Sequence, residues 1–378
     1  MRSDILPFAL PLPRPMQDAN AGAGQAAPFG DLPEWDLSDL YEGPDSAAYA
    51  DDLDAVQTEA KAFAADFEGK LSDLSGDALA GAMTRYEAMS GKIGRIMSYA
   101  GLRYYQNTSD AARAKFMGDA QGRITDDTAP MVFFTLELNR IADDRLAAQL
   151  AESETLRKYA PWIERQRALR PYQLSDELEK YLHDASVVGA AAWNRLFDET
   201  MARLSFDVDG ETLPLEATLT LLSDSDRSRR EAAAEALVAV FQDNLPIFVR
   251  IMNTLVKEHE IETRWRKMPS ADAGRHLANQ VEPEVVDALR TAVMEAYPKL
   301  SHRYYAMKAK WLGLDKMQHW DRNAPLPGEP DRKVGWEEAK DTVMSAYADF
   351  SPKMAEIAAP FFTPAPSRTP RSPTCTPM

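Results

Sequence analysis

The segment 53–67, L-D-A-V-Q-T-E-A-K-A-F-A-A-D-F, decides the fold class of this chain. Its apolar residues recur at alternating steps of three and four: Leu53, Val56, Ala60, Phe63 and Phe67. Side chains at this spacing lie along one stripe of an α-helix, whereas a strand would bring every second side chain to one face. The segment therefore predicts an amphipathic helix that packs through this stripe.

The same spacing recurs towards the C-terminus. A second helix is expected over 79–100, with a break at 107–110, and a third begins with Ser109 as its N-cap and ends before Pro130. Further helices are expected at 131–141, 146–159, 175–183 and 190–204. The first half of the chain is thus predicted to be an all-helical array.

One interruption indicates β-structure. Residues 204–208 alternate apolar and polar side chains, Asp209-Gly210 is a strong two-residue turn signal, and residues 212–215 can form the returning strand. The predicted fold class is therefore mainly α, a multi-helix array with one small β-hairpin.

Prolines lie within the helices predicted for the second half of the chain. Residues 232–267 could form one long helix that begins at a capping box of Ser228 and Glu231, but Pro246 must bend or split it. A further helix is expected over 283–311, with Pro298 inside it, and another over 336–359. The loop between these two is expected at 325–330.

Composition excludes several classes of protein. The 378 residues carry 59 acidic against 43 basic side chains, a net charge of −16, so a nucleic-acid or anionic-membrane partner is not expected. The longest apolar run, 131–138, is too short to span a bilayer, and we expect a cytoplasmic protein. The single cysteine, Cys375, excludes an internal disulfide and any site with several thiolate ligands.

The two ends differ in composition from the rest. Residues 1–31 are interrupted by prolines and rich in Gly and Ala, and they are interpreted as a disordered leader, not a secretory signal. Residues 363–378 hold five Pro, four Thr and no acidic side chain. This tail is either an ordinary disordered segment or, in our interpretation, aberrant sequence foreign to the protein, such as translation in another frame.

Metal-site patterns are incomplete. The chain has five histidines, and none is followed four residues later by another, so the zinc motif H-E-x-x-H is absent. His259-Glu260 begins the motif, but Thr263 stands where the second histidine would be. His259 with Glu258 and Glu262 is interpreted as a charged helix face. The histidines are His183, His259, His276, His302 and His319.

Other catalytic patterns are missing too. Neither a G-x-S-x-G elbow nor a glycine-rich phosphate loop occurs, and Cys375 lies in the Pro/Thr-rich tail without a structured base. The sequence therefore yields no catalytic, cofactor-binding or metal-binding residue.

Two side-chain clusters have alternative interpretations. The tyrosines could line a peptide groove, but half-buried helix packing with the hydroxyl in water is favoured: Tyr99, Tyr104, Tyr105, Tyr304 and Tyr305. Three arginines near a helix start could bind an anion, but pairing with Glu231 and Glu235 on an exposed face is favoured: Arg227, Arg229 and Arg230.

Several motifs, in order, resemble the oligoendopeptidase F family, zinc peptidases related to thimet oligopeptidase. The first two are L-P-E-W-D-L-S-D-L-Y at 32–41 and Y-A-G-L-R-Y-Y-Q-N-T at 99–108. Others are the hairpin 206–213, the stretches 226–236, 257–264 and 270–281, H-R-Y-Y at 302–305, W-L-G-L-D at 311–315 and W-D-R-N-A-P at 320–325. The resemblance is nearly continuous from residue 32 to residue 362.

The resemblance implies the N-terminal part of a helical channel fold, in which zinc held by H-E-x-x-H and a downstream Glu cleaves short peptides. None of those catalytic positions occurs in this sequence, so no zinc is expected to bind this chain. The expected organisation is a leader at 1–31, a helical lobe at 32–204, a hairpin plus the start of a peptidase domain at 205–362, and the tail at 363–378. We expect a peptidase truncated before its zinc site and inactive as written; the alternative is a non-catalytic helical scaffold or peptide-binding protein.

Overall fold

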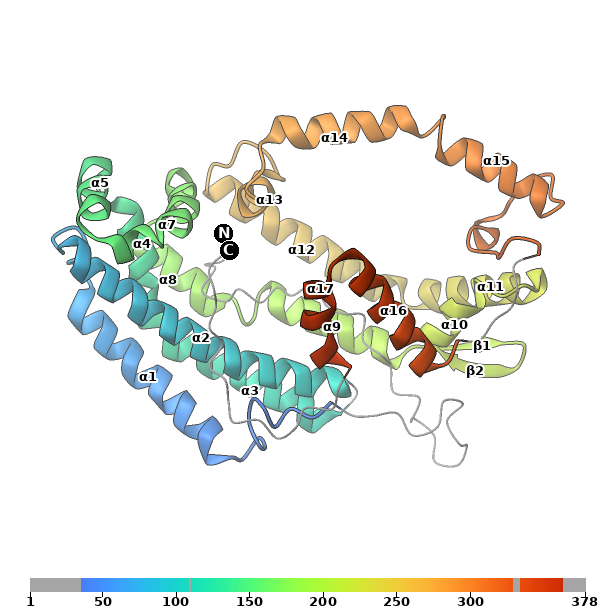
Figure 1. Ribbon diagram of the computed structural model, residues 1–378. Coiled ribbons are helices and arrows are strands. Elements are labelled where there is room, and N and C mark those ends of the chain that lie inside the picture. The colour runs from blue at the N-terminus through green and yellow to red at the C-terminus, as the bar shows by residue number, and fades with distance from the viewer. Residues whose placement is uncertain (1–34, 109, 329–333, 363–378) are drawn as a thin grey trace.

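The computed structural model describes residues 35–108, 110–328 and 334–362. Over these residues the chain is a succession of helices with one two-stranded antiparallel sheet (Figure 1). The predicted fold class, mainly α with one small β-hairpin, is confirmed. The expected leader at 1–31 and the tail at 363–378 lie outside the described residues.

The first half is built from nine α-helices and two short 3₁₀ segments within the described residues. They are α1 (Ala47–Phe67), α2 (Gly76–Gln106), α3 (Ala111–Thr128), η1 (Ala129–Met131), α4 (Val132–Arg140), α5 (Asp143–Glu152), α6 (Glu154–Arg157), α7 (Ala160–Arg167), η2 (Arg170–Tyr172), α8 (Asp176–Ala185) and α9 (Ala190–Arg203). Helices α1, α2 and α3 run side by side, and α4 to α7 gather at one end of them (Figure 1).

An aromatic core holds these helices together. The Phe63 side chain is fully buried, and its ring lies 5.1 Å from that of Phe134, which in turn stacks on Tyr86 at 4.7 Å. The stripe of 53–67 is confirmed, since Leu53, Val56, Ala60 and Phe63 are buried, whereas Phe67 at its end is only half-buried. Side chains from α1, α2 and α4 therefore share one core.

The β-hairpin is confirmed. Strand β1 (Ser205–Val208) pairs with β2 (Glu211–Pro214), with Phe206 opposite Leu213. Asp209 and Gly210 have φ angles of 55° and 83°, as a two-residue hairpin turn requires. The Gly210 N–H donates to the Asp207 carboxylate at 2.9 Å. Phe206 is fully buried, with its ring 5.9 Å from that of Phe241.

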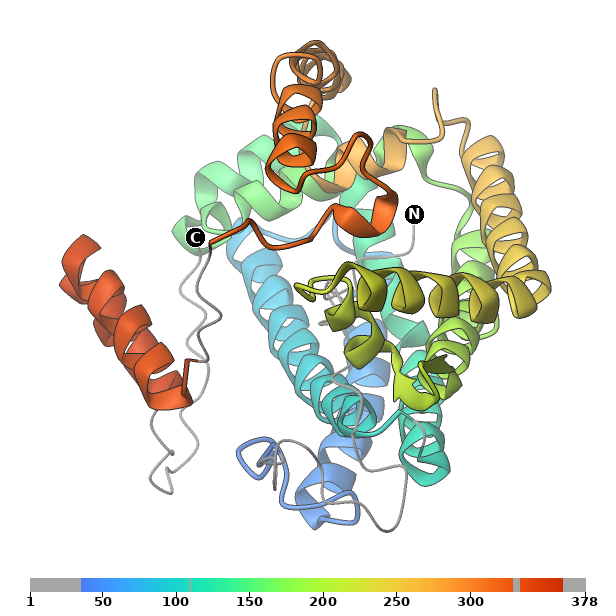
Figure 2. The same cartoon turned by 90° about the vertical axis from the view of Figure 1, so that its right-hand side faces the viewer.

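The second half continues through helices on both sides of the predicted breaks. They are α10 (Leu215–Leu221), α11 (Arg227–Asp243), α12 (Leu245–Trp265), α13 (Ala273–Ala278), α14 (Pro283–Ala296), α15 (Ser301–Trp311), η3 (His319–Asp321), α16 (Trp336–Phe350), α17 (Pro352–Ala358) and η4 (Ala359–Phe361). From α12 the chain forms an arc through α13, α14 and α15, and η3 brings it back to α11 (Figures 1 and 2).

Prolines split the long helices of this half. Pro246 separates α11 from α12 at a bend of 66°, as predicted. The single helices predicted over 283–311 and 336–359 are wrong, because the chain breaks around Pro298 and before Pro352. A proline ring clashes with the backbone of the preceding turn and removes one donor, so each helix ends there.

Polar side chains correct three further boundaries. The helix predicted over 146–159 is two helices, because Ser153 is extended and caps α6 by accepting from the Leu156 N–H. The predicted capping box of Ser228 and Glu231 is wrong, since the Asp226 carboxylate caps α11. Asp110 caps α3 by accepting from two backbone N–H groups, while Ser109 lies outside the described residues. Aspartate satisfies the free N–H groups of a first turn as well as serine does.

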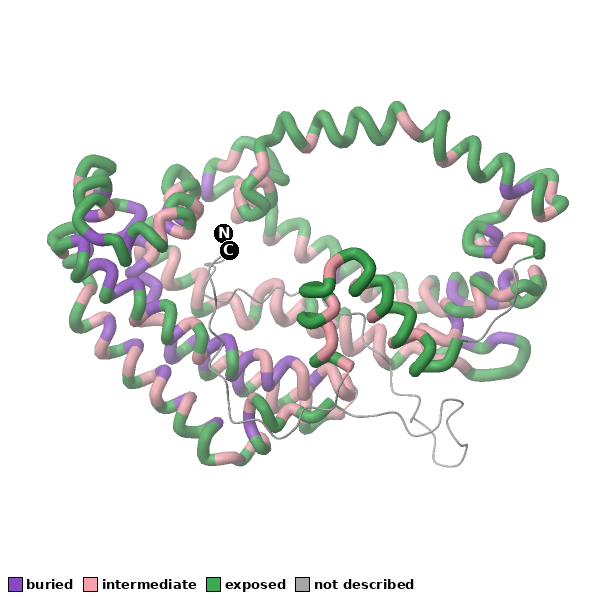
Figure 3. Tube along the Cα trace, in the orientation of Figure 1, coloured by how far each residue is buried: buried purple, intermediate pink, exposed green. Residues whose placement is uncertain are grey.

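The arc is far more exposed than the first half. Figure 3 shows buried positions concentrated in α1 to α7 and few along α12 to α17. No residue of α14 or α16 is buried. Among the described residues, no single helix is long and apolar enough to cross a bilayer, and only the bent pair α11 and α12 passes that test together, by length and composition.

Substitution of one buried and one exposed phenylalanine tests this difference. Phe63→Ala removes a fully buried ring from the core and should lower the free energy of unfolding by about 3–5 kcal/mol. Phe350→Ala is the matched control, because that ring is 84% exposed, and it should leave the free energy of unfolding nearly unchanged. Urea unfolding followed by circular dichroism measures both; equal losses would contradict the assigned core.

Candidate functional site

A large cavity lies between α3, α8, α9 and α12. Its volume is about 1400 Å³, and the ends of α2 and α4 complete its wall. Helices α9 and α12 run antiparallel along it: the Ala190 N–H donates to the Glu258 carboxylate at 3.2 Å, and the Phe197 and Phe248 rings lie 5.9 Å apart. A cavity of this size exceeds the needs of one small metabolite and fits an extended peptide segment.

One end of the cavity is closed by a buried ion-pair network. Arg266 is 4% exposed and donates to both carboxylate oxygens of Glu179 at 2.7 and 2.9 Å, and to Glu262 at 2.9 Å. Burial alone lowers the pKa of Arg266, but Glu179 and Glu262 raise it above its ordinary value. The network joins α12 to α8, so these charges hold the wall together.

The other end carries polar groups without partners. Tyr104 is 3% exposed, and its hydroxyl makes no hydrogen bond within the described part of the chain. Burial, together with the nearby carboxylates of Asp198 and Glu199, raises the pKa of Tyr104 to about 12. Burial and Glu199 likewise raise the pKa of Asp198 above its ordinary value.

Arg195 stands beside these groups and reaches towards α3. A Cβ atom at position 118 would lie 2.9 Å from the Arg195 Nη1 atom, so the guanidinium would have to shift if residue 118 carried a side chain. A glycine inside a helix costs about 1 kcal/mol relative to alanine. Local sequence patterns did not indicate Arg195, although a glycine inside a predicted helix is a weak signal of a close contact there.

The tyrosine cluster divides between core, cavity and surface. Tyr99 is buried, with its ring 5.3 Å from that of Tyr41, and Tyr104 is buried in the cavity wall, so the expectation of half-buried rings with wet hydroxyls is wrong for both. Both positions lie on the packed side of α2. Tyr105 lines the cavity, and Tyr304 and Tyr305 lie exposed on α15.

The candidate metal ligands make other contacts. The His259 Nε2 atom lies 2.6 Å from the Ala271 carbonyl oxygen, Glu258 accepts from the Ala190 N–H, and Glu262 pairs with Arg266. The His183 Nε2 atom lies 3.0 Å from the Thr125 carbonyl oxygen, and His276 lies beside Asp272. His302 and His319 lie against aromatic rings. No group of three or more His, Cys, Asp or Glu that could hold a metal ion occurs among residues 35–108, 110–328 and 334–362. Cys375 lies outside them.

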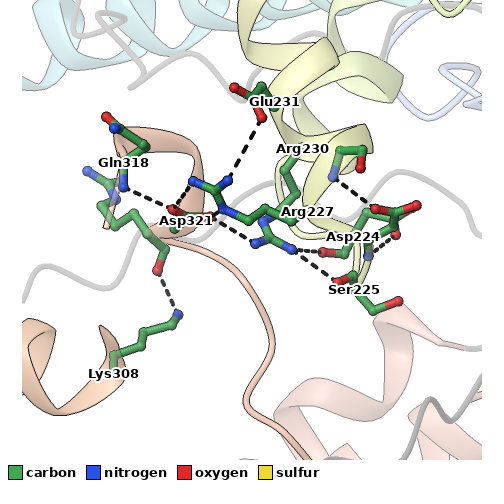
Figure 4. Close-up of polar contacts among 11 residues, drawn as sticks. Asp224, Ser225, Arg227, Arg230, Glu231, Lys308, Gln318 and Asp321 are labelled. Carbon is green, nitrogen blue, oxygen red and sulfur yellow. Dashed lines mark hydrogen bonds and ion pairs between the residues drawn. The ribbon is translucent and has the colours of Figure 1, made fainter. Parts of the chain in front are cut away.

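The arginine cluster corrects the sequence interpretation. Arg230 is buried, not on an exposed face, and donates to Asp321 at 2.9 Å (Figure 4). Arg227 donates to both oxygens of the same carboxylate, at 3.1 and 3.2 Å. Arg227 also lies 3.9 Å from Glu231, one of the predicted partners, whereas Arg229 pairs with Asp224. A fully buried carboxylate attracts these guanidinium groups more strongly than a solvated glutamate does.

Asp321 joins the far end of the arc to α11. Its side chain is fully buried and also accepts from the Gln318 N–H at 2.9 Å, while the nearby Lys308 donates to the Arg322 carbonyl (Figure 4). Burial alone raises the pKa of Asp321, but the Gln318 N–H and the Arg227 and Arg230 guanidinium groups hold it below its ordinary value. Ninety-one residues separate Arg230 from Asp321, so local sequence patterns could not reveal this pair.

Comparison with known proteins supports a family assignment for this chain. The Oligopeptidase F family profile matches residues 137–206. The chain is 27% identical over 329 residues to Oligopeptidase PepF of Bacillus subtilis, covering 85% of this chain and 48% of that protein. It is also 27% identical to Group B oligopeptidase PepB of Streptococcus agalactiae, covering 81% and 51% of the two chains. These matches support the assignment of this chain to the oligoendopeptidase F family.

The fold agrees with this assignment. The crystal structure of oligoendopeptidase-F from Enterococcus faecium superposes with a TM-score of 0.69 at 23% identity, covering 82% of this chain and 64% of that one. The chain spans about half the length of the curated relatives it matches.

Zinc, on which this family of peptidases generally depends, has no matching donor set here. The described residues bring together no three suitable side chains, and the histidines nearest to a motif are held by other contacts. The described part of the chain therefore does not fit the family's metal.

Removal of the Asp321 charge tests its role in holding the arc. Asp321→Asn leaves two guanidinium groups without their carboxylate and should lower the free energy of unfolding by about 3–5 kcal/mol. It should also open the segment 312–328 to limited proteolysis. Asp287→Asn is the control, since its pair with Arg290 is solvent-exposed and is worth about 0–1 kcal/mol. Equal protease resistance in the two variants would rule out this role.

The same carboxylate predicts an acid dependence. Because its pKa in the folded chain is below the ordinary value of 3.8, Asp321 stabilises the fold above that pH. This contribution is lost as the pH falls below 3.8 and through the folded pKa, where the folded state must also take up the proton. The stability difference between wild type and Asp321→Asn, measured by urea unfolding from pH 6 to pH 2.5, should shrink below 3.8. A difference that does not change with pH would contradict the assignment.

Proposed function

We propose that this chain is the N-terminal, peptide-covering portion of an oligoendopeptidase-F-like zinc metalloendopeptidase, and that it does not hydrolyse peptides by itself. Residues 32–204 form the covering lobe, and residues 205–362 form the hairpin and the start of the peptidase domain. The proposal includes the expected aberrant origin of the tail at 363–378 and a cytoplasmic location. Its main support is that the chain matches only about half the length of its relatives.

Exposed apolar stripes support the same proposal. On α14, side chains at regular steps of four are 41–65% exposed: Val285, Leu289, Val293 and Tyr297. Helix α16 exposes Val343, and α17 exposes Met354 and Ile357. A helix with an apolar stripe normally buries it against another element, so these stripes match surfaces that further helices cover. Exposed apolar side chains thus occur within both 285–312 and 343–357.

The absence of a metal-binding donor set supports the proposed inactivity. Peptide hydrolysis in a zinc peptidase needs a bound ion that lowers the pKa of water, and such an ion needs three protein ligands. The described residues offer no such set. In this proposal, the contribution of this portion is the cavity between α9 and α12, whose long wall a peptide chain can contact.

Peptide hydrolysis by the separate and combined halves tests the proposal. The purified 378-residue chain with added zinc should not cleave quenched fluorescent peptides. Mixing it with the remaining C-terminal half of PepF from Bacillus subtilis, inactive alone, should give chelator-sensitive cleavage, because the two halves would rebuild the channel. The control is the same mixture with both motif histidines of that half replaced by alanine. Chelator-sensitive cleavage by the 378-residue chain alone would refute the proposal.

A non-catalytic scaffold is the alternative, and thermal unfolding separates the two. A fragment with uncovered stripes should bind a hydrophobic dye and unfold over a broad temperature range. Addition of the complementary half should suppress the dye signal. A sharp transition without dye binding, and no effect of the complementary half, would favour the scaffold.

A further inference from the structure

The cavity between α9 and α12 has a charged end whose groups are not paired with one another. Arg195 and Asp198 lie three positions apart on α9, a spacing at which opposite charges commonly pair. Neither makes an ion pair or a side-chain hydrogen bond to any other described residue, although both line the cavity. At the opposite end, by contrast, Glu179 and Arg266 neutralise each other.

The packing around Arg195 explains why it does not pair with Asp198. Its guanidinium group is directed to α3, where Gly118 leaves the space that a Cβ atom would fill. A partly buried guanidinium in this position has its donors free for a ligand. Five N–H donors in a planar fork match the two oxygens of a carboxylate better than any other biological anion except phosphate.

A second group points to a ligand at the same end. Tyr104 is nine-tenths buried or more, lines the cavity and has a hydroxyl without a hydrogen-bond partner in the described structure. A buried hydroxyl left unpaired is unfavourable, so a ligand oxygen that accepts from it would be stabilised. Burial raises the pKa of this hydroxyl, whereas the positive charge of Arg195 acts to lower it, and Tyr104 and Arg195 both line the cavity. The two donors therefore lie in the same part of the cavity.

The rest of the cavity is apolar enough to hold a peptide. Side chains from three helices contribute to this surface: Met117 in α3, Leu178 and Leu182 in α8, and Val249 and Ile261 in α12. A free carboxylate or phosphate alone would leave this apolar surface empty, whereas an apolar peptide would cover it.

We propose that Arg195 and Tyr104 form a carboxylate-binding subsite that anchors an apolar peptide in the cavity between α9 and α12. The guanidinium binds the carboxylate oxygens, the hydroxyl donates to one of them, and the apolar side chains of the peptide lie along α8 and α12. Asp198 opposes the bound anion and so limits affinity. The inference rests on the proposed peptide-covering role and deepens it by naming the group that is recognised.

Calorimetric titration of the whole 378-residue chain tests the subsite with two probes. One is an N-acetylated apolar pentapeptide with a free C-terminal carboxylate, and the other is the same peptide as its C-terminal amide. The acid should bind at least tenfold more tightly than the amide. A third probe, the amide carrying one glutamate side chain, separates a terminal from a side-chain carboxylate. Equal affinity for the acid and the neutral amide, or no binding of either, would overturn the proposal.

Substitutions assign the selectivity to the two residues. Arg195→Gln should abolish the preference for the acid, Arg195→Lys should keep part of it, and Gly118→Ala should weaken acid binding by displacing the guanidinium. Arg203→Gln on the same helix, with a 74% exposed side chain outside the cavity, is the matched control and should change nothing.

Two further variants distinguish binding from folding. Tyr104→Phe removes an unpaired hydroxyl, so it should weaken acid binding without lowering the melting temperature. Asp198→Asn should tighten acid binding; if it weakens binding instead, the cavity recognises an amine and the proposal fails. These experiments measure peptide binding, whereas the test of the proposed function measures peptide cleavage by the mixed halves. A negative result in one experiment therefore does not decide the other.

Discussion

The buried Asp321 carboxylate is the interaction on which the second half of the structure depends. It receives hydrogen bonds from Arg227, Arg230 and the Gln318 backbone, and so joins residues at opposite ends of a loop of more than ninety positions. Between them, α14 contributes no buried residue. The arc is therefore anchored by charge at its end and by little apolar burial along its length, which makes a single fully desolvated acid unusually important.

The two halves of the structure are thus stabilised by different interactions. The first half buries an aromatic core around Phe63 and Phe134, where close packing leaves little freedom for the helices to shift. The second half presents helices whose apolar stripes face solvent. The chain spans about half the length of the oligopeptidase relatives it matches. Under the proposed function, the uncovered stripes are therefore interfaces for further helices.

The cavity between α9 and α12 lies where these two kinds of structure meet. Its first wall comes from the packed half, through α3 and the end of α2, and its second from α12, where the exposed half begins. Arg266 and Glu179 connect the walls at one end, and the other end carries Arg195, Asp198 and Tyr104, whose side chains are not paired with one another in the described part of the chain. In the proposed role, a ligand contacts both halves at once.

The sequence by itself determined most of the helices and the hairpin, and it indicated the family. Spacing of three and four, Asp209-Gly210 and Pro246 act over a few residues, and the backbone responds to them locally. It failed where two local signals competed, as at Ser153 and Asp226, and where Pro298 and Pro352 ended helices that periodicity alone would have continued. Only the tertiary structure decided the partners of the charges. Arg230 pairs with Asp321 and Arg266 pairs with Glu179, whereas Arg195 forms no ion pair within the described residues. Burial sets the strength of an ion pair, and burial depends on segments that are far apart in the chain.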